Sequence, residues 1–201
     1  MEKAAILNRY IEENGSRPRD LKAIQELDAE AAGQEDLRPY ETFAWTEFFS
    51  KLIDEVTGQE VYLEYACRER FLAFCYSLEQ ALNENPHFGR SYLSDSLVPG
   101  VSPSRLNGAA EVFRNYATEL LAQGVETGEV KERPFLMDHY PEAAWKACLL
   151  IMDFWRKDRS EESEQTDVMI EKSVNSFFDM VGHLPIDSII DLGKFLWQSK
   201  S

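Results

Sequence analysis

Histidine and cysteine are the residue types in this chain that most often do chemistry, and their spacing predicts no metal or catalytic site. His87, His139 and His183 lie far apart, and none has a second His or Cys three or four residues away, the spacing that brings two ligands onto one helical face. The chain also has no G-x-S-x-G, P-loop or G-x-G-x-x-G motif. We therefore expect no metal site, no cofactor and no enzymatic activity.

The cysteines and the first residues indicate a cytoplasmic protein. Cys67, Cys75 and Cys148 are an odd number without C-x-x-C spacing, which argues against a disulfide framework or a zinc ribbon. The start MEKAAILNRYIEE carries charges where a signal peptide needs an apolar region, and the longest apolar run, residues 147–152, is too short to cross a bilayer. We expect a reducing compartment and no membrane partner.

The overall charge argues against a broad surface for polyanions. The 201 residues include 21 Lys and Arg against 36 Asp and Glu, which leaves a net charge of −15. Nucleic acid and anionic lipid repel a chain with this net charge unless it carries a local basic patch.

The spacing of apolar residues predicts an all-α protein. The 10 glycines and 8 prolines fall between segments whose apolar residues repeat at helical spacing, and no segment alternates with period two for long. We expect about nine to ten helices, read at residues 2–13, 20–32, 41–56, 60–84, 87–95, 104–126, 132–138, 141–158, 161–181 and 185–199.

Two consecutive segments carry more apolar surface than one core face needs. Residues 143–155 are apolar around nearly the whole circumference, and the next segment repeats the theme. Such a pair is typical of a four-helix interface between two copies, so we predict a homodimer; a central buried hairpin in a monomer is the alternative. The predicted interface residues are Trp145, Leu149, Phe154, Ile170, Val174, Phe177 and Val181.

Two stretches resemble the TetR family of bacterial transcriptional regulators. The first is LLAQGVETGEV at 120–130, where a glycine, a short turn and a Gly-Glu-hydrophobic step close a long helix. The second is the long helix pair at 140–181, whose second helix begins with an acidic turn containing Thr and Asp. The resemblance implies a small three-helix domain with a helix-turn-helix at 1–56, and a helical ligand-binding and dimerisation domain at 57–201.

The first domain departs from the family pattern in its charge. Between Ala23 and Ser50 one cation, Arg38, stands against seven acidic residues, a net of −6, whereas DNA-binding proteins use several Lys or Arg contacts to phosphate. Pro39 is a second objection, because a proline inside a recognition helix removes a backbone donor. We expect a degenerate DNA-binding domain. DNA stays a possible but disfavoured partner, and the residues that could contact it are Arg17, Arg19, Lys22 and Arg38.

The chain has the material for an apolar small-molecule pocket. Its candidate lining combines bulky side chains, adaptable sulfur groups and a few polar tips, and the resemblance implies a ligand among the corresponding helices. Plain core packing is the alternative for each residue. The candidates are Phe71, Cys75, Leu78, Tyr92, Leu93, Phe113, Tyr116, Cys148, Met152 and Trp155.

The two ends of the chain carry further expectations. Residues 185–201 form an amphipathic stripe with no net charge, which we expect to pack back on the body. A second resemblance, to lipid- or quinone-binding accessory proteins that keep a TetR fold without binding DNA, implies a membrane-facing terminal helix instead. Near the other end, we expect the aromatic helix 40–56 to pack on the segment beginning near Val61.

Overall fold

The computed structural model describes residues 2–18, 21–24, 37–93 and 102–183, and every structural statement below concerns these residues. They contain no strand, which confirms the all-α prediction for this part of the chain. The α-helices are α1 (Glu2–Asn14), α2 (Arg38–Thr57), α3 (Cys67–Glu84), α4 (Pro86–Tyr92), α5 (Asn107–Thr127), α6 (Tyr140–Lys157) and α7 (Glu164–Phe178).

Seven α-helices in the described residues are fewer than the nine to ten predicted. The predicted helix 132–138 reduces to the 3₁₀ turn Met137–His139. The predicted helix 60–84 splits into a 3₁₀ turn, Glu60–Glu64, and α3, because the backbone is extended at residues 65 and 66. The predicted helix 185–199 lies outside the described residues, as does most of 20–32, of which the 3₁₀ turn Leu21–Ile24 is seen.

Proline and glycine set several helix ends. Pro39, Pro86 and Pro141 occupy the first turns of α2, α4 and α6, where a missing backbone N–H costs no hydrogen bond. Gly128 ends α5 with φ of 81°, a left-handed conformation that favours glycine. Because Pro39 opens α2, the objection that it interrupts a recognition helix was wrong.

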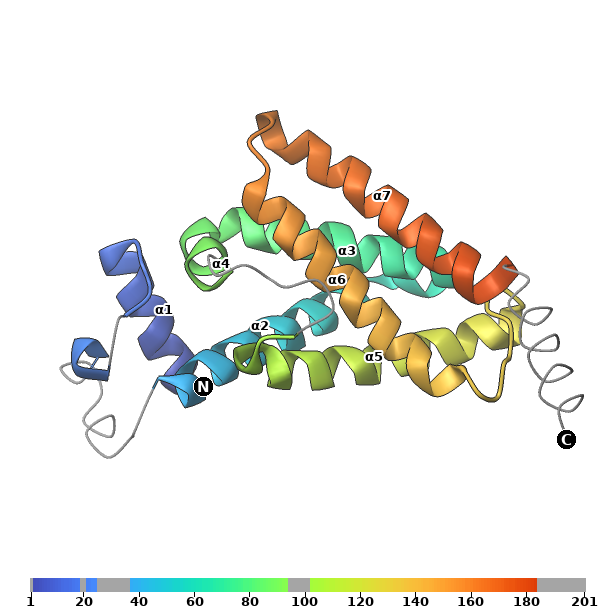
Figure 1. The fold of residues 1–201 in the computed structure, drawn as a ribbon, viewed down its shortest axis with the longest axis horizontal. Helices are drawn as coiled ribbons and strands as arrows, with labels where there is room; N and C mark the ends of the chain where they lie inside the picture. Colours follow the sequence, from blue (N-terminus) through green and yellow to red (C-terminus); the bar gives the residue numbers. More distant parts are fainter. Residues whose placement is uncertain (1, 19–20, 25–36, 94–101, 184–201) are drawn as a thin grey trace, which may run out of the picture.

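The helices pack around one continuous core (Figure 1). α2 lies along α5, and α3 packs against α2, α5, α6 and α7. α6 and α7 form a hairpin that crosses the other helices, and α1 lies at one end of the molecule against α2 and α4. None of the described helices is both long and apolar enough to cross a membrane.

The aromatic residues of α2 belong to this core. Trp45 and Phe49 are fully buried, and the Phe49 ring lies 5.4 Å from the ring of Trp145 on α6. Phe43, by contrast, stays 39% exposed. Helix 40–56 is thus packed on the body as expected: it contacts the segment beginning near Val61, through the turn Glu60–Glu64 and α3, and it packs most extensively along α5.

Candidate functional site

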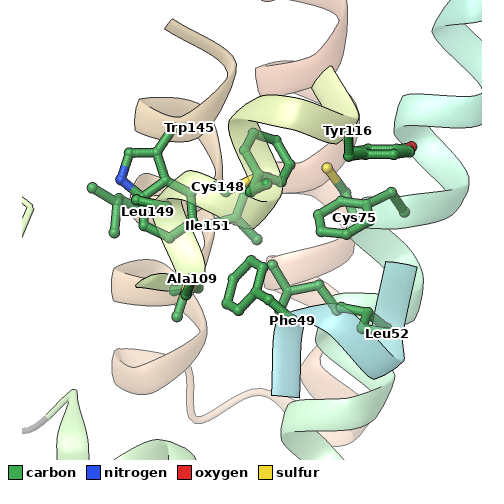
Figure 2. Close-up of a cluster of buried hydrophobic side chains, with 14 of the residues drawn as sticks. Phe49, Leu52, Cys75, Ala109, Tyr116, Trp145, Cys148, Leu149 and Ile151 are labelled. Carbon is green, nitrogen blue, oxygen red and sulfur yellow. The ribbon is translucent and has the colours of Figure 1, made fainter. Parts of the chain in front are cut away.

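The ten predicted pocket residues come together in the interior. They are contributed by α3, α4, α5, α6 and the residue that ends α4, and every one of them is buried. Figure 2 shows part of this cluster, with Cys75 of α3, Tyr116 of α5 and Cys148 of α6 beside Phe49 and Leu52 of α2. Their role in binding a ligand stays a prediction, because each also fills the core.

Most polar groups in this interior already have partners. The Tyr116 hydroxyl lies 3.0 Å from the Tyr62 hydroxyl. The indole Nε1 of Trp155 donates to Asn83 Oδ1 at 2.7 Å, and Nε1 of Trp145 donates to Ser102 Oγ at 3.3 Å. These bonds fix the orientation of three large rings and leave no free donor on them.

Cys67 and Cys148 in the core are not activated. Burial raises the pKa of the Cys148 thiol, and its neighbour Cys75, which shares a hydrogen bond with it, raises it further. Burial likewise raises the pKa of Cys67 to about 12. Because the thiolate is the reactive form, these side chains behave as small apolar groups and not as nucleophiles.

Two buried polar atoms in the described interior, on Tyr92 and Trp45, lack the hydrogen bonds that the others make. Within the described residues, neither the Tyr92 hydroxyl nor the Trp45 Nε1 has a hydrogen-bond partner. Their rings pack edge to face with centroids 6.3 Å apart. Burial also raises the pKa of Tyr92, so its hydroxyl keeps its proton and can donate. A buried donor without a partner costs about 1–3 kcal/mol, which an acceptor group on a ligand would recover.

The sequence predicts Tyr92 as a pocket residue but does not predict Trp45. Trp45 lies in the predicted N-terminal domain, and its helical spacing with Phe48, Phe49 and Leu52 indicated packing only. No pattern in the sequence distinguishes an indole with a hydrogen-bond partner from one without. Only the three-dimensional packing of α2 beside α4 identifies this donor.

The predicted interface residues lie mostly inside a single chain. Six of the seven, Trp145, Leu149, Ile170, Val174, Phe177 and Val181, are buried by the chain's own helices. Phe154 alone among the seven keeps partial exposure. A dimer made through α6 and α7 therefore needs contacts from other positions of these helices.

α6 and α7 do present such positions. Ala143, Ala147, Leu150 and Phe154 are half-buried or exposed and follow each other at steps of four, three and four residues, which places them on one stripe of α6. Leu150 is 46% exposed, and Val168 on α7 is 49% exposed. Exposed large apolar side chains on neighbouring helices are typical of a protein contact surface.

The predicted DNA-contacting residues give no compact basic surface that the structure describes. Lys22 and Arg38 are exposed and Arg17 is half-buried, whereas Arg19 lies outside the described residues together with residues 25–36. Near them on α1, Arg9 is paired with Glu13 at 2.9 Å.

The described residues contain no group of three or more His, Cys, Asp or Glu side chains arranged to hold a metal ion.

The family model described as "Tetracyclin repressor-like, C-terminal domain" matches residues 70–196. A solved structure from Syntrophomonas wolfei, assigned to the TetR family of transcriptional regulators, is 16% identical with a TM-score of 0.62, covering 91% of this chain and 95% of its own. A protein of unknown function from Rhodococcus sp. RHA1 is 12% identical with a TM-score of 0.56, covering 90% of this chain and 94% of its own. No curated protein matches the chain significantly.

Proposed function

This chain belongs to the TetR family, and we propose that it is a transcriptional regulator that dimerises through α6 and α7 and binds an apolar small molecule in its core. The family match spans residues 70–196, which include all of α5, α6 and α7 and most of α3. The domain division at residues 56 and 57, at the end of α2, is part of this proposal.

The unpartnered donors of Tyr92 and Trp45 carry the ligand proposal. The side chains that pack on the two rings are mainly apolar and aromatic, with the charges of Glu41, Arg17 and Arg105 close enough to act on the Tyr92 hydroxyl, so the ligand is apolar over most of its surface. The two donors select a molecule that also carries a hydrogen-bond acceptor, such as a carbonyl oxygen. Binding such a molecule pairs two groups that otherwise remain desolvated without partners.

Native mass spectrometry of the purified protein tests this proposal, because a ligand that pairs buried groups survives purification. We expect an added mass that organic extraction removes. Tyr92→Phe deletes one donor and keeps the ring, so it should lower the occupancy, whereas Tyr65→Phe, a tyrosine of the turn before α3, should not. A mass equal to the bare chain, together with no binding of added quinones or ketones in fluorescence titrations, would contradict the ligand proposal.

The dimer face that we propose is the stripe Ala143, Ala147, Leu150 and Phe154 of α6 with Val168 of α7. Two small residues on α6 let a second helix approach closely, and the larger side chains fill the contact. α6 has 18 residues and is about 27 Å long, enough for a four-helix interface with a symmetry-related copy. This face replaces the buried residues first predicted for it.

The acidic composition of residues 23–50 favours a second function, a ligand- or lipid-binding TetR-fold protein without DNA binding. A gel shift with genomic DNA fragments at low salt separates the two, since contacts to phosphate are strongest there. Retardation that disappears with rising salt supports the regulator. A protein that retards no fragment at low salt, yet still carries a ligand, supports the second function.

A further inference from the structure

A cleft lies between α1, α2 and α4, at the end of the molecule where α1 packs. It consists of two neighbouring hollows of about 190 Å³ and 140 Å³, and Asn8, Asn85 and Phe88 line both. The larger hollow is also lined by Glu47, Phe48 and Lys51 of α2. This cleft is distinct from the apolar interior, although the Phe88 ring also packs on Trp45 with centroids 4.7 Å apart.

Only one of the two carboxylate oxygens of Glu47 has a partner among the described residues. Its Oε1 accepts an ion pair from Lys51 Nζ at 2.7 Å, whereas its Oε2 is buried and has no hydrogen-bond partner among the described residues. The Glu47 side chain is 20% exposed and that of Lys51 is 68% exposed, so the lysine approaches from the solvent side. A desolvated carboxylate oxygen without a donor is costly, and a charged N–H donor is its strongest partner.

Aromatic and amide groups complete the lining. The rings of Phe48 and Phe88 lie with centroids 5.7 Å apart and planes 33° apart, and both border the larger hollow. Aromatic faces attract cations through their negative π surface. The amide nitrogen of Asn85 donates to the Ala81 carbonyl at 3.0 Å, which leaves its oxygen as an acceptor toward an incoming donor.

The charged side chains around the cleft are mainly negative. Glu12, Glu47 and Glu84 line the two hollows against one lysine, Lys51. An anion would meet net repulsion here, and a purely apolar molecule would leave Glu47 Oε2 without a partner. A cation that carries N–H donors satisfies both the charge and the hydrogen-bond requirement.

We propose that this cleft binds a small organic cation with N–H donors, an ammonium, amidinium or guanidinium group on a flat apolar body. The charged group pairs with the Glu47 carboxylate, which turns slightly to present Oε2 to the hollow, and the apolar body lies against Phe48 and Phe88. Together the two hollows reach the lower end of the roughly 300–1,000 Å³ range of small-molecule sites, so the ligand is compact. Because the cleft is formed by α1, α2 and α4, such a ligand bridges the N-terminal helix to the body of the protein.

The test uses three probes of one size on the full chain: benzamidine, benzyl alcohol and benzoate. Isothermal titration should show saturable binding of benzamidine. Benzyl alcohol and benzoate should bind at least about tenfold more weakly, the loss of one charge-assisted hydrogen bond. Equal binding of the three probes, or no saturable binding of benzamidine, overturns the proposal.

Two variants of α2 should change benzamidine affinity in opposite directions. Glu47→Gln keeps the shape and removes the charge, so binding should fall about tenfold or more. Lys51→Met removes the competing cation from Glu47, so binding should strengthen severalfold. Glu55→Gln, an exposed change on the same helix, is the matched control and should leave affinity unchanged. Circular dichroism checks that each variant is folded, and unchanged affinity in a folded Glu47→Gln protein assigns the binding to another site and refutes ours.

Discussion

Asp158 should be the main stabilising residue of the connection between α6 and α7. Its Oδ1 accepts hydrogen bonds from Ser160 N at 2.8 Å and Ser160 Oγ at 2.7 Å, and its Oδ2 accepts from Thr166 N at 2.9 Å and Thr166 Oγ1 at 2.7 Å. Between these partners, Glu162 and Ser163 adopt positive φ of 49° and 62°, which strains residues with a side chain. The four bonds hold this strained turn closed.

The pKa of Asp158 sets the size of the effect. Desolvation opposes its ionisation, but the hydrogen bonds from Ser160 and Thr166 outweigh desolvation and lower the pKa from 3.8 to about 2. One pKa unit corresponds to about 1.4 kcal/mol, so the ionised carboxylate contributes about 2 kcal/mol to folding at neutral pH. Because the folded pKa lies below the unfolded one, this stability is complete above pH ~4 and is lost as pH falls toward 2, with about half remaining at pH 3.

Asp158→Asn keeps the size of the side chain and removes the charge. We expect it to lower the free energy of unfolding by about 2 kcal/mol at pH 7 and by about half as much at pH 3. Urea denaturation followed by tryptophan fluorescence, at one protein concentration, measures both values. Asp54→Asn is the matched control, because it makes the same change at an exposed position of α2. A loss below about 0.5 kcal/mol at pH 7, or an equal loss at both pH values, refutes this account.

Three further changes test other parts of the core. Burial raises the pKa of Glu79, and Asp167, which shares a hydrogen bond with it, raises it further. The ionised Glu79 therefore lowers the free energy of unfolding as the pH rises above ~4. Glu79→Gln should stabilise the protein by about 1–3 kcal/mol in thermal melts at pH 8 and not at pH 4. Gly89→Ala places a Cβ 2.8 Å from the Trp155 ring and should cost about 1–3 kcal/mol in urea titrations, less in a Trp155→Phe background. Glu129→Ala removes the carboxylate that accepts from the backbone N–H of Cys67 at the start of α3, and should cost about 1–2 kcal/mol; equal melting temperatures would contradict this.

The sequence predicts helix ends correctly where a proline or a glycine marks them. Prolines at the first turns of α2, α4 and α6 and the glycine after α5 set boundaries that local geometry alone dictates. The break before α3 carries no such residue, since Tyr65 and Ala66 are compatible with helix. There the packing of α3, whose first backbone N–H groups bind Glu129, overrides the helical periodicity.

The candidate site was harder to derive than the fold. An all-round apolar helix such as α6 needs cover on every side, and the sequence cannot say whether that cover comes from the same chain or from a second copy. For Trp145 the cover is internal, because the rings of Phe49 and Phe113 lie 5.4 Å and 5.6 Å away. Likewise, tertiary packing decides that the N–H of Trp45 and the hydroxyl of Tyr92 have no hydrogen-bond partner among the described residues, and no local sequence pattern predicts this.

The measurement that tests the regulator proposal most directly is the oligomeric state of the protein and of one charged variant of the proposed dimer face. We expect sedimentation velocity at micromolar concentration to give a dimer, about twice the 23.2 kDa chain mass. Leu150→Glu should give a folded monomer, because a charge at the centre of an apolar contact is desolvated without a partner. Leu63→Glu, a change at a leucine that is 72% exposed outside α6 and α7, should stay dimeric. A wild-type monomer, or a Leu150→Glu protein that remains dimeric, would contradict the proposed interface.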